Sequence, residues 1–185
     1  EIDPFLEKLG RTMNVSHAYL FENHPLENGE PGKSIRYEWS APDTESDLEN
    51  PEYSNRPLNS PELRVWYGVM KQRFPYIGDA QHVSQEEMES LRVRGIESLL
   101  DVPVFVNDEW WGIIGFDDMI KPREWSTDEV DALTVAANSL GAAIQRQIAE
   151  NALTNELAER KRTEMALRFS EEKFAKAFDT THVLM

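Results

Sequence analysis

The sequence contains no cysteine, and this absence excludes several kinds of function. Without a thiol the chain can form no disulfide bond, no thiolate metal site and no cysteine nucleophile. It also cannot hold a chromophore through a thioether bond. We therefore expect no cofactor and no covalent bilin, while an unidentified small-molecule ligand stays open. The absence is also consistent with a cytoplasmic location.

Long hydrophobic runs are missing as well. No uninterrupted apolar stretch approaches the roughly 18 residues that span a bilayer, so we expect no direct insertion into a membrane. The N-terminus lacks the basic end and the apolar run of a signal peptide. Both observations favour a cytoplasmic protein.

Positive charge is scarce over most of the chain. The 185 residues include 19 Lys and Arg against 34 Asp and Glu, a net charge of -15. Residues 151–185 hold six acidic and six basic residues, so the whole excess lies in residues 1–150. A domain with this charge repels phosphate backbones and anionic lipids, which excludes nucleic acid as an expected partner.

Several stretches have the residue pattern of β-strands. Residues 15–21 alternate between two faces. Residues 35–40 predict a strand with one face in water, and the side chains predicted to share the buried face are Ile35, Tyr37 and Trp39. Residues 99–106 and 110–116 flank a short polar turn and predict a β-hairpin at the centre of a sheet.

Two helices are predicted from local signals in the middle of the chain. A helix over residues 61–74 begins after Ser60, whose side chain can cap it. The next helix begins at Ser84, which forms a capping box with Glu87, and it ends at Gly95.

A much longer helix is predicted at the C-terminal end. It begins with a capping box between Ser126 and Glu129, and no proline follows as far as Phe178. About 50 helical residues would extend roughly 75 Å, far beyond the width of a small domain. Residues at three-four spacing form a stripe in two series that are out of phase by about two residues. The series are Leu133, Ala137, Leu140 and Ile144, then Leu153, Leu157, Arg160, Glu164, Leu167, Glu171, Phe174 and Phe178. Such a stripe needs a partner helix, and we expect a homodimer through this helix.

Four segments occur in an order that resembles a known family. They are Gly95–Val104 (GIESLLDVPV), Trp111–Asp118 (WGIIGFDD), Arg123–Ser126 (REWS) and the alanine-rich Leu133–Arg146. Together they resemble the GAF domain, a sensory α/β module of bacterial signalling proteins, over residues 3–150. The resemblance implies an α+β fold with a central antiparallel sheet of about six strands, flanking helices and a long C-terminal signalling helix.

The segment after the GAF-like region resembles the linker helix and opening helix of a PAS domain. The similarity lies in residues 156–162 (ELAERKR) and 166–178 (ALRFSEEKFAKAF). We therefore predict a GAF-like sensory domain over residues 1–148, a coiled-coil linker helix over 149–168, and the truncated start of a PAS domain over 169–185.

The succession of GAF and PAS domains resembles the input half of a sensor histidine kinase. We interpret the chain as a non-enzymatic sensory module with no catalytic residues, which binds a small molecule or partner and relays its state to downstream PAS and kinase domains in the same chain. Two alternatives stay open. One is a dimerisation module without a ligand, and the other is the input domain of a cyclic-di-GMP synthase, which would carry the same front end.

The candidate ligand residues lie on the two helices that, by resemblance, cover the pocket face of the sheet, and on the segment between them. They are Trp66, Met70, Phe74, Tyr76, His82, Met88, Leu91 and Trp111. Apolar walls with a few polar groups are typical of small-molecule pockets, although the same side chains also build a core.

Other candidate sites are less favoured by the sequence. No two of the four histidines have metal-ligand spacing, so we expect no metal site. Asp117 and Asp118 point to opposite faces if the strand continues, so we interpret them as solvated, turn-capping groups at a strand end. The Asn-Lys-Phe-Asp-Glu motif of cyclic-nucleotide GAF domains and the Asp-Ile-Pro signature of bilin-binding members are both missing, which disfavours both ligands.

Overall fold

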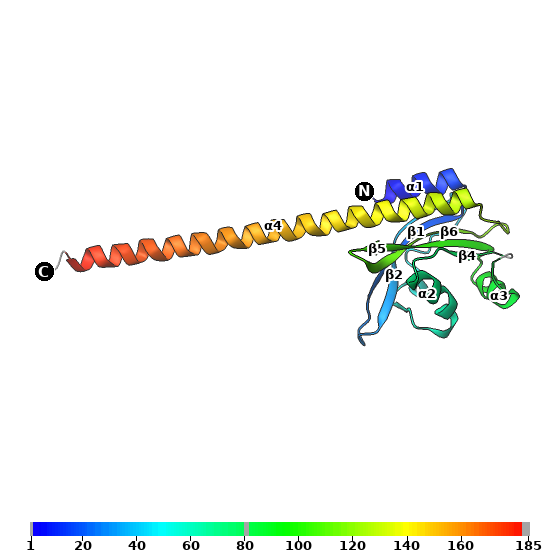
Figure 1. Ribbon diagram of the computed structural model, residues 1–185, viewed down its shortest axis with the longest axis horizontal. Coiled ribbons are helices and arrows are strands. Elements are labelled where there is room, and N and C mark those ends of the chain that lie inside the picture. Colours follow the sequence, from blue (N-terminus) through cyan, green and yellow to red (C-terminus); the bar gives the residue numbers. More distant parts are fainter. Residues whose placement is uncertain (1, 80–81, 183–185) are drawn as a thin grey trace. The chain divides into compact units, whose positions relative to one another are not determined.

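The computed structural model describes residues 2–79 and 82–182, and a six-stranded antiparallel sheet forms its centre (Figure 1). The strand order is β3-β2-β1-β6-β5-β4. In chain order the elements are α1 (Ile2–Met13), β1 (His17–Pro25), β2 (Pro31–Ser40), η1 (Pro51–Tyr53), β3 (Arg56–Pro57), η2 (Pro61–Leu63), α2 (Arg64–Lys71), β4 (Tyr76–Gly78), α3 (Gln85–Val93), β5 (Ser98–Val106), β6 (Glu109–Asp118) and α4 (Thr127–His182). The predicted α+β architecture with a six-stranded sheet and a long C-terminal helix is confirmed.

Helices cover both faces of the sheet. Helix α1 and the first turns of α4 lie on one face, and α2 and α3 lie on the other (Figure 1). On the α4 side, Leu133 and Ala137 are buried, and a Cβ atom at Gly141 would lie 2.3 Å from the carbonyl oxygen of Phe105. The small residues of this helix therefore allow it to pack closely on β5.

A β-bulge in β2 changes the predicted face of three residues. Leu20 of β1 pairs with Tyr37, but the next residue, Phe21, pairs with Ile35, so Arg36 is left out of the register. The alternation is therefore interrupted at Arg36. Ile35 joins the core cluster on the α2 side, whereas the ring of Trp39 lies against α1. The prediction that Ile35, Tyr37 and Trp39 share one face is wrong for this reason.

The helix predicted over residues 61–74 is shorter and begins differently. A 3-10 turn precedes α2, and α2 ends at Lys71. Arg73 has a φ of 71°, a left-handed conformation that ends a helix. The hydroxyl of Ser60 makes no capping hydrogen bond. Phe74 therefore leaves the buried face of the predicted helix and is 62% exposed.

The capping box at the start of α4 is confirmed. The backbone N–H and the hydroxyl of Ser126 donate to Glu129 at 2.9 and 2.8 Å, and the N–H of Glu129 donates to the Ser126 hydroxyl at 3.3 Å. Burial alone would raise the pKa of Glu129, but the hydrogen bonds from Ser126 and Arg123 outweigh it and lower this pKa. The carboxylate therefore both caps the helix and holds Arg123.

We expect the substitution Ser126→Ala to lower the free energy of unfolding by about 1 kcal/mol, because it leaves helix N–H groups without a capping acceptor. The matching fall in Tm is roughly 2–4 °C for a chain of this size. Ser139→Ala is the control, because Ser139 is an exposed α4 residue whose hydroxyl bonds only Val135 in its own helix. Equal thermal shifts in the two variants would contradict a specific role for the cap.

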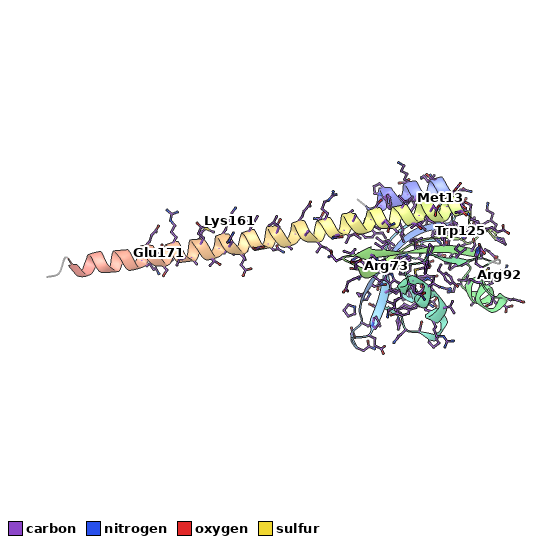
Figure 2. The ribbon with its side chains drawn as sticks, in the orientation of Figure 1. Met13, Arg73, Arg92, Trp125, Lys161 and Glu171 are labelled. Carbon is purple, nitrogen blue, oxygen red and sulfur yellow. The ribbon has the colours of Figure 1, made fainter. Side chains whose placement is uncertain are left out.

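The chain divides into two compact units, residues 1–142 and 143–185. Helix α4 is continuous to His182, and all side chains of residues 145–173 are exposed, Lys161 and Glu171 among them (Figure 2). The side chains of residues 174–182, and residues 183–185 altogether, lie outside the described part. No helix among the described residues has both the length and the apolar content needed to cross a bilayer.

Candidate functional site

A small cavity of about 40 Å³ is lined in part by Tyr19, Phe21 and Ile35, which share a core cluster with Trp66 and Met70 of α2. Its lining comes from β1, β2, β3, β5 and β6, from the segment that joins β2 to β3, and from the residues just after α3. It is rich in charged groups of both signs. The cations are Lys33, Arg56 and Arg94, and the acids are Glu38, Asp47, Asp101 and Asp117.

Asp101 is the hydrogen-bond centre of this cavity. The Tyr19 hydroxyl donates to its Oδ1 at 2.9 Å, and the indole N–H of Trp66 donates to its Oδ2 at 2.7 Å. Burial raises the pKa of Asp101, while the charge of Lys33 and these two bonds oppose that rise. Burial also raises the pKa of Tyr19, so its hydroxyl stays a donor. Strands β1 and β5 and helix α2 are thereby linked through one carboxylate.

Lys33 is a buried cation that faces the same cavity. Its Nζ atom lies 4.0 Å from the ring centroid of Trp66 and 4.5 Å from that of Phe21. Burial lowers its pKa to about 8, although the nearby charge of Asp101 acts in the opposite direction. Aromatic faces stabilise an ammonium group electrostatically, but they accept no conventional hydrogen bond.

His17 and Asp117 form a second buried pair at the edge of the cavity. Nδ1 of His17 lies 2.8 Å from a carboxylate oxygen of Asp117, and Nε2 lies 2.9 Å from the carbonyl oxygen of Glu45. Burial lowers the pKa of His17, but Asp117 and the Glu45 carbonyl outweigh it and raise this pKa to about 9. Burial raises the pKa of Asp117, opposed by the imidazolium. The pair is therefore an imidazolium and a carboxylate at neutral pH.

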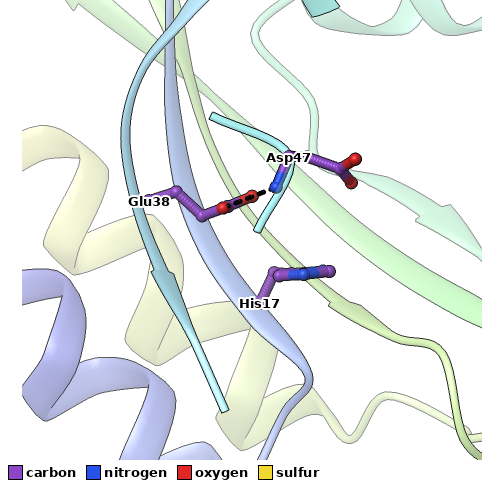
Figure 3. Close-up of side chains that lie close together, drawn as sticks. All are labelled: His17, Glu38 and Asp47. Atoms are coloured by element: carbon purple, nitrogen blue, oxygen red, sulfur yellow. Dashed lines mark hydrogen bonds between the residues drawn. The ribbon is translucent and has the colours of Figure 1, made fainter. Parts of the chain in front are cut away.

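Glu38 holds the acidic loop beside the cavity in place. One of its carboxylate oxygens accepts hydrogen bonds from the hydroxyls of Ser40 and Ser46 and from the backbone N–H of Asp47. Figure 3 shows the last of these bonds, with His17 lying next to it. The loop is thus attached at two points, to Glu38 through Ser46 and Asp47 and to His17 through Glu45.

His17, Glu38 and Asp47 bring three potential metal ligands within 4.8 Å of one another (Figure 3). Both ring nitrogens of His17, however, face oxygen acceptors, so both carry hydrogens and no lone pair is left for a metal. Glu38 is already bonded to three donors. The donor set is better suited to fixing the loop than to holding a cation.

A larger open groove of about 710 Å³ lies on the outside of the same loop. It is lined by residues of the 43–51 segment with Met119 and Ile120. Asp43, Glu45 and Glu49 contribute acidic side chains to it, and all three are exposed. Since the groove contains no buried polar side chain, we place the candidate site in the smaller cavity.

The eight candidate ligand residues are separated by the fold. Trp66 and Met70 are buried in the core cluster that includes Tyr19, Phe21 and Ile113 of the sheet. Met88 and Leu91 are buried in a second cluster with Ile96 and Leu99. Tyr76 packs against both clusters.

The other three candidates lie further from the core. His82 bonds Asp79 at 2.6 Å with a side chain 45% exposed, Phe74 is exposed and Trp111 is half-buried. As far as the described residues go, none of the eight candidates lines the cavity. Of the eight, Trp66 forms a hydrogen bond to a residue that lines the cavity, since its indole N–H donates to Asp101.

The interpretation of the adjacent acids is half right. Asp118 accepts backbone N–H bonds from Ile120 and Lys121 and so caps a turn, as predicted, but it is buried and not solvated. Asp117 is not a solvated strand end, because it is buried and bonded to His17. The two side chains do different tasks because neighbouring strand residues point to opposite faces.

The polar residues of the cavity were missed by the sequence interpretation. Asp101 is the one charged residue between Leu99 and Val106, in an otherwise apolar strand. Lys33 points to the same face of the sheet as Ile35, because residues two positions apart in a strand share a face. A charge at an inward position of a strand is the signal that could have identified both residues.

The family model described as GAF domain matches residues 2–144. A methanogenesis regulatory histidine kinase, FilI of Methanothrix harundinacea, is 38% identical over 141 residues, which cover 76% of this chain and 16% of the relative. The chain thus spans about a sixth of that protein.

Solved structures share the fold at lower identity. The photoproduct state of a GAF domain from Synechocystis is 22% identical, with a TM-score of 0.62 over 81% of this chain and 94% of that one. The phycoerythrobilin-bound and phycocyanobilin-bound GAF domains from a cyanobacterial phytochrome are 19% and 18% identical. Their TM-scores are 0.66 and 0.63, and each comparison covers 80% of this chain and 85% of the other.

These neighbours correct the expectation about cofactors. Domains of the same fold bind phycoerythrobilin and phycocyanobilin, so the statement that a bilin is excluded is wrong. The absence of cysteine excludes a thioether bond to a chromophore, and it excludes no ligand held by non-covalent contacts.

Proposed function

The chain belongs to the GAF domain family, and from this premise we propose that it is the non-enzymatic sensory domain of a larger histidine kinase. In this proposal a small molecule binds in the cavity beside Asp101, and the bound state is relayed through α4 to downstream PAS and kinase domains. The similarity to a regulatory histidine kinase over the whole folded unit carries the proposal.

The proposed relay requires α4 to act as a dimer. In residues 143–182, taken by themselves, the apolar side chains of Leu153, Leu157 and Leu167 are each about half or more exposed. A second copy of the same helix is the occupant we propose for this stripe. Residues 151–185 have no net charge, whereas the rest of the chain carries all of the -15, so two copies repel least along this helix.

Polar residues within the stripe favour a helix pair that can change its packing over one that is fixed in a single packing. Arg160 and Glu164 occupy positions in line with Leu157 and Leu167. Charged groups at seam positions weaken a coiled coil, so two packings of the helices can have similar free energies. A ligand shifts the balance only if it binds the two packings unequally.

We expect removal of residues 147–185 to abolish the dimer at micromolar concentration, because the truncated chain keeps the sensory unit but loses the stripe. Sedimentation equilibrium of the two proteins over a hundredfold dilution provides the measurement. The double variant Leu153→Lys and Leu157→Lys is the matched test within the full chain, and Glu156→Lys with Glu159→Lys is its control. A truncated chain that keeps its dimer mass on dilution would overturn the proposed seam.

The small size of the cavity supports a second candidate function. At about 40 Å³ it is well below the several hundred cubic ångströms usual for organic ligands. A dimerisation module without a ligand would have such a closed interior. Native mass spectrometry of freshly purified protein distinguishes the two functions, since a retained small molecule would contradict the module without a ligand.

A further inference from the structure

The acidic groups around the cavity already have hydrogen-bond donors within the protein. Asp101 accepts from Tyr19 and Trp66, and Asp117 accepts from His17. Glu38 accepts from the loop, as described above. Asp47 completes the set, because one of its carboxylate oxygens accepts from the side-chain amide of Asn50 at 2.9 Å. Each of these four carboxylates thus has at least one oxygen bonded within the protein, and Asp101 has both oxygens bonded in this way.

Two cations of the cavity, Lys33 and Arg94, differ from these acids because their side chains have no hydrogen-bond partner among the described residues. Lys33 is 7% exposed, and no acceptor among residues 2–79 and 82–182 lies within hydrogen-bond distance of its Nζ atom. The guanidinium of Arg94 also lines the cavity, and within the described part of the chain it too forms no hydrogen bond or ion pair. A buried ammonium without an acceptor is costly, and the cavity gives it room for one.

The cavity is therefore complementary to a group that brings negative oxygens. About 40 Å³ is room for roughly three water molecules, or for one small planar anion. Ile96, Leu99 and the ring of Tyr53 supply apolar surface beside the cations. This combination suits a carboxylate that carries no more than a methyl group.

We propose that the cavity binds the carboxylate of a short monocarboxylic acid, with Lys33 and Arg94 donating hydrogen bonds to its two oxygens. This inference rests on the proposed sensory function and names the class of ligand sensed. Glu38 and Asp47 also line the cavity and repel a second negative charge, so a dicarboxylate of similar length binds more weakly.

Binding should be accompanied by proton uptake. Burial holds the pKa of Lys33 at about 8, so a fraction of this side chain is neutral at slightly alkaline pH. A bound carboxylate raises that pKa, because an opposite charge nearby favours the protonated amine. Calorimetry at pH 8 in two buffers of different ionisation enthalpy should give different apparent heats, and the difference should disappear in Lys33→Met.

The direct test is isothermal titration of the full chain with sodium formate and sodium acetate at constant ionic strength, beside oxalate and malonate. We expect the monocarboxylates to bind with dissociation constants between about 10 µM and 1 mM. Lys33→Met and Arg94→Gln should each weaken binding tenfold to a hundredfold, because each removes a charged hydrogen-bond donor. Lys71→Met and Arg64→Gln, which change exposed cations of α2, are the matched controls and should not alter affinity.

Arg94→Gln keeps the test decisive if Lys33→Met does not fold, since Arg94 is only half-buried. No heat from any monocarboxylate at concentrations on the order of 10 mM would overturn the inference. Biliverdin, whose propionates carry the same group, is titrated in parallel. Binding of biliverdin without binding of the short acids would also overturn it, and would leave the proposed sensory function standing.

Discussion

Replacing Asp101 with alanine should lower the free energy of unfolding by about 3–5 kcal/mol. The carboxylate is buried and is the acceptor for the Tyr19 hydroxyl and the Trp66 indole N–H. It is also the nearest opposing charge for the buried Lys33. The substitution leaves two buried donors without an acceptor and a buried ammonium without compensation, and these costs are larger than that of the lost side-chain volume.

Two further variants separate these contributions. Asp101→Asn keeps one carbonyl oxygen that can accept a single hydrogen bond, so we expect about half of the loss. Adding Lys33→Met to Asp101→Ala removes the uncompensated charge, so the double variant should be more stable than Asp101→Ala alone.

Guanidinium denaturation followed by tryptophan fluorescence is the measurement, because Trp66 contacts Asp101 directly and α4 dominates circular dichroism. A loss below about 1 kcal/mol in Asp101→Ala would show that the carboxylate is not a structural centre. The same result would weaken the case for a preformed anion site, because it would imply that water already reaches Lys33.

Local sequence signals were sufficient wherever the interacting groups are near in sequence. The capping box of α4 joins residues three apart, and its prediction needs no knowledge of the fold. The hairpin turn was equally readable, since Asn107 and Asp108 both adopt positive φ, as a tight hairpin turn requires. Gly95 also has a positive φ and ends α3 as predicted.

The polar pairs of the cavity depend on strand register instead. Tyr19 and Asp101 are 82 residues apart, and His17 and Asp117 are 100 residues apart. Tyr19 meets Asp101 because β1 and β5 both flank β6, and His17 meets Asp117 because the two residues are paired directly between β1 and β6. A shift of one residue in register would turn one partner of each pair to the opposite face. The sequence contains inward charges that mark these positions, but it does not say which charges meet.

The predicted ligand residues were misplaced for a related physical reason. They were taken from apolar helix faces, and apolar side chains satisfy one another by packing closely, as Met70 and Leu91 do in their clusters. The cavity lies instead among charged strand residues such as Lys33 and Asp101, which do not pack together as closely as apolar side chains do. The bulge at Arg36 contributes, because it turns Ile35 and Glu38 toward the cavity side, and no local pattern announces it.

The second large effect concerns pH, and we expect the His17–Asp117 pair to lose about 2–3 kcal/mol of its contribution to stability as pH rises from about 6.5 to 9. Asp117 and the Glu45 carbonyl raise the pKa of His17 from 6.5 to about 9 against the effect of its burial. A group with a raised pKa contributes its full stabilisation below its unfolded value and loses it as pH rises through the folded value. The loss should therefore begin near pH 6.5 and be complete somewhat above pH 9.

Lys33 acts in the opposite direction at higher pH. Its pKa falls from 10.5 in the unfolded chain to about 8, so the folded protein releases this proton first. Stability then increases with pH between about 8 and 10.5. The two groups together predict a curve that falls from about pH 6.5 to 8, is nearly flat between about pH 8 and 9, and recovers most of the loss between about pH 9 and 10.5, because the two pKa shifts are similar in size and opposite in effect. In Lys33→Met the fall should continue to about pH 9 without recovery.

The control is the double variant His17→Gln with Asp117→Asn, which carries neither charge of the pair and should show no fall from this site. The single variant His17→Gln is less suitable, because it leaves Asp117 buried without a cation and free to titrate by itself. Urea denaturation at half-unit steps from pH 6 to 10 gives both curves, and their difference isolates the pair from the other histidines. A flat difference would mean that His17 is neutral in the folded protein. The loop would then be held by Glu38 alone, and a neutral imidazole beside Glu38 and Asp47 would again be open to a metal ion.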